Sequence, residues 1–582
     1  MPWSIHQREA LLQRLRTDIF DLVVVGGGIT GAGVARDAAL RGLKVALIER
    51  GDFASGTSSR SSKLIHGGLR YLEMGDIGLV FEAVRERQRL LELAPHLARA
   101  QSFVLPVFEH SRRSVFVLDV GLTIYDMLAA FAGVMAHRAV RKRALLRLEP
   151  LLKSGGLSGG VRYYDAMTDD SRLVLANVRG ALEAGAVPLS RVAFVEPVFK
   201  NHKLISCRVR DEWTGQAHLV ATKCIVSAAG PWTDDMMGKW KGQDAASTLK
   251  PSKGVHVVVP RARLPLSQAV MMTATDGRVV FALPWAQATV LGTTDTAYSG
   301  PLDEPETTWD DASYLVETAN LHFDVQGGPL AVDDVVSTWA GIRPLVANEP
   351  GQSSYKTSRE HTIATDPRGL VTVAGGKLTT YRVMAAEAVD AALKLLPPQI
   401  VAECKPCVTA RLPLPGAEKM PRKARSLDAL IQLLMAQEGL DLEDARHFAC
   451  QYGSDAGDVI AYCRATPTDP GMTRPSPGVE PPSQATRQPG FERILPDLPL
   501  RWGELDWMVR EEMALTLVDV AVRRSHLYYV AGERLLPIVD ALAARLAAAC
   551  GYPAERQRAQ ADEIRAYIAD HRVAPREASH AA

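Results

Sequence analysis

The fold of this chain is decided by the stretch Asp21-Leu-Val-Val-Val-Gly-Gly-Gly-Ile-Thr-Gly-Ala-Gly33. The apolar run Leu22 to Val25 is typical of a buried strand, and the glycines that follow favour a tight turn. An alanine-rich helical stretch then continues to Leu40, and the apolar run Lys44 to Glu49 indicates a second strand. Because a helix connects them, the two strands are predicted to lie parallel in one sheet, as a β-α-β unit.

The turn in this unit has the spacing of a dinucleotide-binding motif, with Gly26, Gly28 and Gly31 in a Gly-x-Gly-x-x-Gly pattern. Glycine permits a close approach of the backbone to a pyrophosphate, whose charge then lies at the positive end of the following helix. Glu49 stands where a carboxylate accepts both ribose hydroxyls. A glycine turn that binds nothing is the alternative, but the strand, helix and acid around it favour an adenine dinucleotide.

The choice between a nicotinamide and a flavin depends on the segment from Gly51 to Gly68. Hydroxyl groups, a lysine and glycines are concentrated there, as expected of a loop that runs along an extended cofactor. These residues include Thr57, Ser58, Ser62, Lys63, His66 and Gly67. The composition favours a flavin, and a serine-rich surface loop is the alternative.

The overall composition is that of a globular protein. The chain has 582 residues, of which 47% are hydrophobic and 23% charged, and its formal charge of +1 gives no basic field for nucleic acid. Seven cysteines do not make a disulfide framework in so long a chain and fit a reducing compartment, so a cytoplasmic location is expected. The segment Met1 to Asp21 lacks the apolar core of a secretory signal.

Proline clusters suggest where the chain divides. The segment 397–415 holds five prolines and separates the β-rich part, which ends in a helix from about Thr379 to Leu396, from a mostly helical part. We expect an N-terminal extension over 1–17, a main region over 18–398, a connector over 399–415, a helical domain over 416–570 and a tail over 571–582. Within the helical domain, 466–499 is expected to be a solvated insertion, and apolar residues at helical spacing from Val509 to Val520 indicate a helix.

Two other segments have alternative interpretations. Cys404 and Cys407 form a single Cys-x-x-Cys pair in a proline-rich connector, without the second pair of a structural zinc site, so no metal site is expected. The apolar stretch Val115 to Ala136 is interrupted by Asp119 and Asp126, which argues against a membrane span. Basic residues bracket it, so it could rest on an anionic membrane surface, or it could be an ordinary buried helix.

Several motifs closely resemble those of the FAD-dependent glycerol-3-phosphate dehydrogenase family, within the D-amino-acid-oxidase-like flavoproteins. In the family's order they are His66 to Leu72, Asp169 to Leu173, Ala229 to Trp232, Lys253 to His256, Gly292 to Asp295, Gly341 to Leu345 and Gly375 to Arg382. The resemblance runs from about residue 18 to 395 and is weaker beyond, and the first residues and the segment 466–499 are untypical of the family. It implies an α/β (α+β) fold: a Rossmann-like FAD-binding domain, an interleaved β-sheet substrate domain and an α-helical C-terminal domain.

The resemblance also implies an activity. The family oxidises sn-glycerol 3-phosphate to dihydroxyacetone phosphate in glycerol and glycerophospholipid catabolism, and electrons pass from reduced FAD to a membrane quinone. We therefore expect peripheral contact with the inner face of the cytoplasmic membrane, and a homodimer is compatible with the sequence. An oxidase that passes electrons to O2, and a non-catalytic FAD-binding scaffold, are the alternatives.

The family's motifs assign roles to individual residues. The resemblance implies a substrate site formed by Arg70, Tyr71, Arg343, Arg359 and Lys377, in which Arg343 lies at the reacting end and Lys377 with Arg70 at the anionic end. Bidentate arginine and point-charge lysine suit a phosphate dianion.

Catalysis is assigned to Arg343, His256 and Lys377. His256 is the expected base, because imidazole titrates near neutral pH, and a cationic Arg343 that lowers the pKa of the alcohol is the rival account. Further FAD contacts are expected from Gly230, Asp295, Gly376, Leu378 and Thr379.

Overall fold

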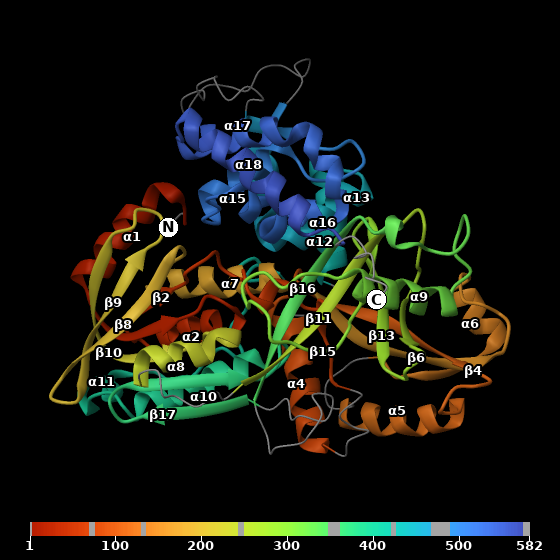
Figure 1. Cartoon of the computed structure of the whole chain (residues 1–582), viewed down its shortest axis with the longest axis horizontal. Coiled ribbons are helices and arrows are strands. Elements are labelled where there is room, and N and C mark those ends of the chain that lie inside the picture. The colour runs from red at the N-terminus through yellow and green to blue at the C-terminus, as the bar shows by residue number, and fades with distance from the viewer. Residues whose placement is uncertain are drawn as a thin grey trace, which may run out of the picture.

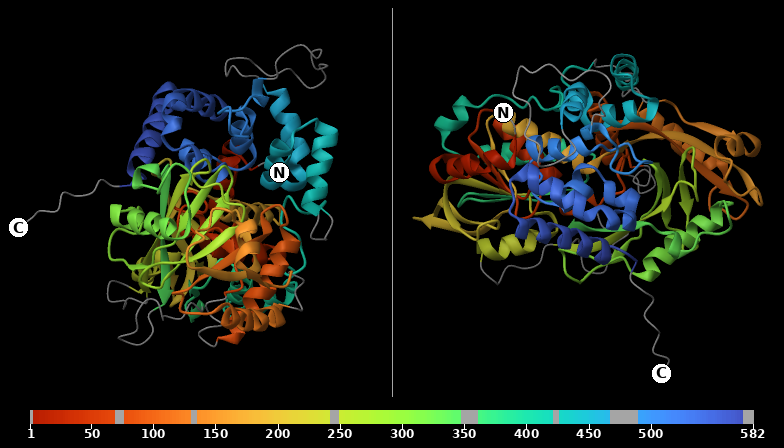
Figure 2. Two further views of the ribbon diagram at one scale, coloured as in Figure 1. Left: turned by 90° about the vertical axis from the view of Figure 1, so that its right-hand side faces the viewer. Right: turned by 90° about the horizontal axis from the view of Figure 1, so that it is seen from above.

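Two β-sheets stand side by side, and a layer of C-terminal helices lies over them (Figures 1 and 2). The computed structural model describes residues 3–68, 76–129, 135–241, 249–346, 361–420, 426–466 and 489–573. The first sheet has eight strands and the second ten within these residues. Both sheets draw on distant parts of the chain, so the two units are interleaved in sequence.

The predicted β-α-β unit forms the centre of the first sheet. It consists of β1 (Ile19–Val25), α2 (Ile29–Leu40) and β2 (Val45–Ile48). The strands β1 and β2 are parallel, with Leu22 opposite Val45, which confirms the prediction. The strand order is β17-β18-β10-β1-β2-β7, and β9 and β8 continue from β10. The other strands are β7 (Val187–Leu189), β8 (Val192–Lys200), β9 (Lys203–Asp211), β10 (Ala217–Ser227), β17 (His361–Asp366) and β18 (Leu370–Gly375).

The centre of this sheet is buried because helices pack against it. The helices α2, α7 (Asp170–Glu183) and α10 (Tyr381–Leu393) pack against one another, and α10 corresponds to the helix expected from about Thr379. The side chains of Leu22, Val23 and Val24 in β1 are fully buried. A strand that is covered on both faces needs apolar residues at successive positions, which explains the continuous apolar run in the sequence.

The second sheet is mostly antiparallel. Its long strand β11 (Leu249–Pro260) pairs with β14 (Ala288–Gly292) on one side and with β16 (Ser337–Val346) on the other. A hairpin is formed by β13 (Val279–Trp285) and β14. The remaining strands are β3 (Leu64–Ile65), β4 (Ala98–Phe108), β5 (Arg138–Arg141), β6 (Leu157–Thr168), β12 (Ala269–Thr273) and β15 (Thr296–Ala297).

The C-terminal part is helical, as expected, but it differs from the sequence interpretation in two places. The helix α15 (Trp502–Glu511) ends before Met513, whose φ of 51° is left-handed, and a separate π-helical segment η6 (Asp519–Arg524) follows. One helix through Val509 to Val520 was therefore a wrong prediction, because the backbone turns at Met513. Part of the expected solvated insertion is also packed, since Ile494, Leu495 and Leu498 are buried.

The other C-terminal helices complete this layer. They are α12 (Ser426–Glu438), α13 (Leu442–Tyr452), α14 (Ala456–Ala465), α16 (Leu527–Ala531), α17 (Val539–Cys550) and α18 (Ala554–Asp570). One hydrophobic core joins them to the second sheet, because Phe103 and Trp339 cluster with Leu517, Tyr528 and Tyr529. The helical layer therefore shares its core with the sheet below it.

The N-terminal segment is also packed into the molecule. The helix α1 (Ile5–Thr17) buries Leu12 and Leu15, and Arg8 forms a buried ion pair of 2.7 Å with Asp211. The remaining helices are α4 (Ile77–Leu93), α5 (Val115–Ala129), α6 (Lys142–Leu148), α8 (Thr233–Lys241), α9 (Trp309–His322) and α11 (Pro398–Glu403). Among the described residues, none of the helices combines the length and apolar character needed to cross a membrane.

Candidate active site

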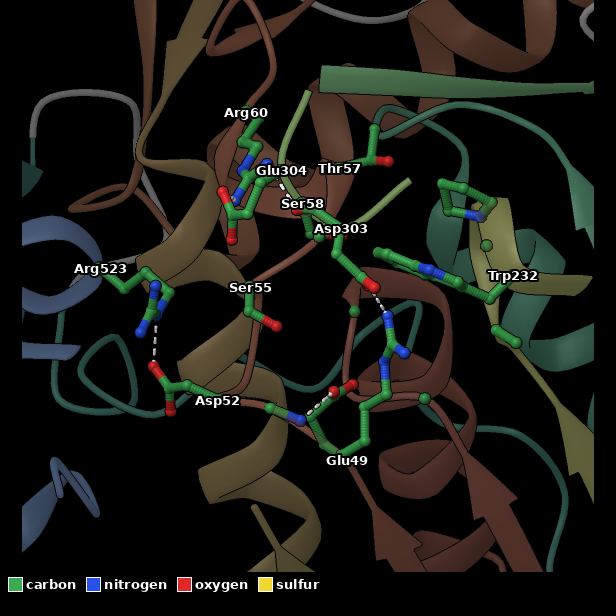
Figure 3. A pocket seen from close by; sticks show the side chains of 18 of the residues that line it. Glu49, Asp52, Ser55, Thr57, Ser58, Arg60, Trp232, Asp303, Glu304 and Arg523 are labelled. Atoms are coloured by element: carbon green, nitrogen blue, oxygen red, sulfur yellow. Dashed lines mark hydrogen bonds and ion pairs between the residues drawn. The ribbon is translucent and has the colours of Figure 1, made fainter. Parts of the chain in front are cut away.

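A cavity of about 2260 Å³ opens where the parallel strands of the first sheet end. Its walls come from the turn after β1, the loop after β2, the turn after β18 and the helix α18. Figure 3 shows the loop residues of this cavity, with Asp52, Ser55, Thr57 and Ser58 along one wall. Ligands of open α/β sheets bind at this edge, outside the carboxyl ends of the strands.

The glycines of the turn after β1 have no room for side chains. A Cβ atom at Gly26 would lie 2.5 Å from the carbonyl oxygen of Ala228, and one at Gly31 would lie 1.9 Å from the carbonyl oxygen of Gly26. A Cβ at Gly28 would lie 3.0 Å from Oγ of Ser58, which accepts a 2.9 Å hydrogen bond from the amide of Ile29. Gly26, Gly28 and Ile29 border the cavity, so the N-terminus of α2 faces it, as a pyrophosphate site requires.

Glu49 lies beside this turn with its carboxylate in the cavity wall. One oxygen accepts a 2.6 Å hydrogen bond from the amide of Gly27, and the other accepts a 2.8 Å bond from the amide of Gly51. Burial raises the pKa of this carboxyl, and the two amide bonds act in the opposite direction. A half-buried carboxylate beside a glycine turn fits the ribose of an adenine dinucleotide.

Arg343 projects from β16 and is held by a set of oxygen acceptors. Its guanidinium donates to Oδ1 of Asp295 at 3.1 Å, to Oγ1 of Thr293 at 3.0 Å and to the carbonyl of Thr294 at 3.1 Å. A Cβ at Gly254 would lie 2.3 Å from the guanidinium, so a glycine is needed there. The motifs around Gly254, Thr293 and Arg343 are therefore brought together.

His256 lies on β11, in register with Trp339 of β16 and with Gly292 of β14. Its Nε2 is 2.8 Å from Oγ of Ser62, and its ring stacks on Trp339 with 5.1 Å between centroids. Burial lowers the pKa of His256 well below its usual value, and the positive charges of Arg343 and Lys63 lower it further. The imidazole is therefore neutral at neutral pH and can accept a proton.

The turn between β18 and α10 contributes Gly376, Lys377 and Leu378 to the cavity wall. The φ of Gly376 is 87°, in the left-handed region that glycine tolerates. Thr379 follows, and its hydroxyl donates a 3.2 Å hydrogen bond to the carbonyl oxygen of His66. The two motifs are 313 residues apart in the sequence and meet here.

Lys63 is buried and does not border the cavity. Its ammonium donates to Oδ1 of Asp170 at 2.7 Å and lies 5.2 Å from the ring centroids of both Trp285 and Trp339. Lys63 therefore ties the loop after β2 to the start of α7, in addition to lowering the pKa of His256.

The predicted residues fall into three groups. Those that border the cavity are Gly26, Gly28, Glu49, Thr57, Ser58, Gly230, Gly376, Lys377 and Leu378. Those that lie behind its walls are Gly31, Ser62, Lys63, His66, Gly67, His256, Asp295, Arg343 and Thr379. Arg70, Tyr71 and Arg359 lie outside the described residues.

Several residues of the cavity were missed by the sequence reasoning. Arg50 lies over the ring of Trp232 at 4.6 Å and pairs with Asp303, and Arg60 pairs with Glu304 at 3.2 Å. Figure 3 shows Trp232 and Asp303 near each other on this wall. Trp232 belongs to a motif quoted above and could have been found from it. Pairs such as Arg60 with Glu304 carry no sequence signal, because the partners are 244 residues apart.

Residues 21–382 match a family described as FAD dependent oxidoreductase, and residues 407–557 match the C-terminal domain of alpha-glycerophosphate oxidase. Glycerol-3-phosphate dehydrogenase 2 of Mycobacterium tuberculosis is 39% identical over 522 residues, which cover 89% of this chain and 83% of the relative. The aerobic glycerol-3-phosphate dehydrogenase of Staphylococcus aureus is 35% identical over 572 residues, 97% of each chain.

Two solved structures are also similar. The glycerol-3-phosphate dehydrogenase from Bacillus halodurans, complexed with FAD, is 30% identical, with a TM-score of 0.76 and 98% of each chain covered. The L-alpha-glycerophosphate oxidase from Mycoplasma pneumoniae, with FAD bound, is 18% identical, with a TM-score of 0.51, and covers 69% of this chain and 100% of its own. At that identity the second likeness concerns the fold alone.

Proposed function

The chain belongs to the FAD-dependent glycerol-3-phosphate dehydrogenase family, and from this premise we propose that it oxidises sn-glycerol 3-phosphate to dihydroxyacetone phosphate and passes the electrons to a membrane quinone. FAD-dependent oxidation of glycerol 3-phosphate is the activity that the family shares by name. The single observation that carries the substrate assignment is the match over 97% of both chains to an aerobic glycerol-3-phosphate dehydrogenase. The acceptor and the residue roles are our proposal.

FAD, when bound, supplies a two-electron acceptor for the hydride that leaves the substrate carbon. Gly26, Gly28 and the amide end of α2 would hold its pyrophosphate, and Glu49 its ribose. Gly26, Gly28, Ile29 and Glu49 all border the cavity, which supports this assignment.

We assign the anionic end of the substrate to Lys377 and Arg70 and the reacting end to Arg343, and we propose substrate contacts for Tyr71 and Arg359 as well. Lys377 borders the cavity on a turn where two glycines bring the backbone close to a ligand. The guanidinium of Arg343 donates to five oxygen acceptors, so its direction is fixed. A fixed guanidinium stabilises negative charge that develops on an oxygen without reorganising.

For the base we retain His256. Its neutral imidazole can accept the hydroxyl proton, and Ser62 orients Nε2. Burial is the main cause of the lowered pKa of His256, and the positive charges of Arg343 and Lys63 add to it, so the imidazole is a weak base. The rival account, in which Arg343 alone lowers the pKa of the alcohol, predicts that His256→Gln leaves the pH profile of kcat/KM unchanged. If His256→Gln instead loses the acidic limb of the kcat/KM profile, His256 is supported as the base.

Contact with a membrane is supported by the helix α5. Most of its exposed side chains are apolar, although Thr123 is exposed as well, and Phe116 is 75%, Met127 66% and Val117 52% exposed. Exposed basic residues lie before and after it, at Arg112, Arg113, Arg138, Arg141, Lys142 and Arg143. An apolar face with a basic border suits the surface of an anionic membrane, where a quinone would be reached.

The test uses the purified holoprotein without oxygen. We expect glycerol 3-phosphate to bleach the flavin absorbance, and a soluble quinone analogue to restore it much faster than air-saturated buffer does. Equal rates with O2 would identify an oxidase, and absence of bleaching with FAD bound would identify a non-catalytic scaffold. Either result would overturn this proposal.

A further inference from the structure

The loop after β2, residues 49–58, is here called the cofactor loop. One side of it borders the cavity through Glu49, Asp52, Ser55, Thr57 and Ser58. Its backbone includes Ala54 with φ of 65°, a left-handed conformation that alanine adopts at a cost. A loop in such a conformation must be held by contacts with its surroundings, and these come from both ends of the chain.

The contact from the C-terminal domain is ionic and buried. The carboxylate of Asp52 is 1% exposed and accepts hydrogen bonds from Nε of Arg523 at 2.5 Å and from Nη2 of Arg524 at 2.9 Å. Arg524 is fully buried and also donates to the carbonyl oxygen of Glu512 at 3.0 Å. Its guanidinium therefore joins the cofactor loop to the backbone of the C-terminal domain.

The contact from the N-terminal segment is aromatic. Trp3 packs on Phe53 with 5.2 Å between ring centroids, and both side chains are buried. On its other side, Phe53 fills the space beside the glycine turn, since a Cβ at Gly27 would lie 2.6 Å from its ring. The carbonyl oxygen of Trp3 accepts a 2.9 Å hydrogen bond from the amide of Met513, so Trp3 also touches the C-terminal domain.

We propose that Trp3 and Arg524 form a clamp that holds the cofactor loop in its FAD-binding conformation from outside the cavity. Neither residue borders the cavity, so both act as positioning residues through Phe53 and Asp52. If loss of the clamp leaves the loop competent in a tenth of the molecules, the apparent Kd for FAD rises about tenfold, because apparent affinity scales with the competent fraction. The inference concerns cofactor retention and depends on neither the proposed substrate nor the acceptor.

The test compares full-length variants from which FAD has been removed. Trp3→Ala and Arg524→Leu remove the two halves of the clamp, and Trp3→Phe keeps a ring. The matched control is Glu512→Gln, because the Glu512 carboxylate forms a buried 2.7 Å ion pair with Arg172 between the same two domains. Within the described part of the chain, this carboxylate makes no hydrogen bond to the cofactor loop. FAD is titrated into each apoprotein and followed by flavin fluorescence, with circular dichroism to confirm the fold.

We expect Trp3→Ala and Arg524→Leu to bind FAD about tenfold more weakly or worse, and Trp3→Phe and Glu512→Gln to stay within about twofold of the wild type. At saturating FAD, kcat and KM should return to wild-type values in each folded variant, because the clamp does not touch the substrate. Unchanged FAD affinity in Trp3→Ala, or an equal loss in Glu512→Gln, would overturn the clamp. If Arg524→Leu does not fold, the comparison of the FAD affinities of Trp3→Ala and Trp3→Phe by itself decides whether the clamp exists.

Discussion

In the site proposed above, the guanidinium of Arg343 and the ring of His256 would set the charge balance at the end assigned to the reacting carbon. Arg343 is oriented by Asp295, Thr293 and Thr294, and it lowers the pKa of the buried imidazole. The motifs around both residues could be found in the sequence. The pairing of Arg343 with Asp295 could not be predicted from the sequence, because the two residues are 48 positions apart and meet only through strand pairing.

We predict that Arg343→Ala lowers kcat/KM about a hundredfold to a thousandfold, the range seen when one fixed donor to a developing oxyanion is removed. Arg343→Lys should recover little, because an ammonium lacks the planar fork. Steady-state kinetics and the flavin absorbance of the purified variants provide the measurements. Arg208→Ala, which removes an exposed arginine 2.9 Å from Glu196, serves as the control. Loss of FAD in parallel with activity would contradict this role.

A second residue-scale prediction concerns His96, away from the cavity. Burial lowers the pKa of His96 to about 3, and Arg172, Arg99 and Arg179 add to this effect. The unfolded chain binds a proton on this ring below about pH 6.5, while the folded chain does not. The free energy of unfolding therefore falls as the pH drops below that value, by about 1.4 kcal/mol per pH unit for this one group.

His96→Gln removes that proton uptake. We expect the variant to be less stable than the wild type at pH 7, through lost packing, and the difference to shrink by about 2 kcal/mol at pH 5. Urea unfolding at the two pH values measures it. A difference that stays constant would show that His96 becomes protonated in the folded chain as well.

At the scale of elements, regular patterns were predicted well and irregular ones were not. The run from Leu22 to Glu49 gave a correct β-α-β unit, because apolar strand, glycine turn and helix each have a local signal. The break at Met513 has no such signal, since methionine rarely adopts a left-handed φ. The packing of 489–499 was missed because its composition resembles a linker, whereas Phe491 stacks on Phe448 at 6.1 Å.

The helix α5 yields a prediction at this scale. It lies on the side of the molecule opposite the C-terminal helices (Figure 1). We expect the double variant Phe116→Ser, Met127→Ser to bind vesicles of mixed neutral and anionic lipid about tenfold more weakly than the wild type, because two exposed apolar side chains no longer enter the bilayer surface. Co-sedimentation of the purified holoprotein measures this.

The control replaces two exposed leucines of the helical layer, Leu433→Ser with Leu442→Ser, which are 47% and 49% exposed. This variant should bind vesicles like the wild type. Equal vesicle binding by the wild type and both double variants would show that α5 does not contact the membrane.

At the scale of the whole molecule, the domain boundary near 399–415 remains a prediction, but the parts on either side of it share a core. Trp339 of the second sheet packs on Tyr529 of α16 with 4.9 Å between ring centroids. Ion pairs such as Arg172 with Glu512 cross the same junction. The sequence could indicate a helical C-terminal part, but not that this part would border the cofactor cavity through α18.

We therefore predict that residues 416–573 do not fold independently. Expressed alone, this segment should keep helical circular dichroism but lack a near-ultraviolet signal and a cooperative thermal transition, because the partners of Tyr528 and Tyr529 in the second sheet are missing. The full chain should show one transition. A sharp transition of the isolated segment would contradict the shared core.

The contact between Asp52 and Arg524 spans 472 residues of sequence, which has a consequence for biosynthesis. A nascent chain carries Asp52 out of the ribosome early, but at roughly 5–20 residues per second its arginine partner follows only tens of seconds later. During that interval the glycine turn is already made while the loop beside it lacks its anchor. Flavin capture should thus be a late event, and products that stop before Arg524 should be colourless.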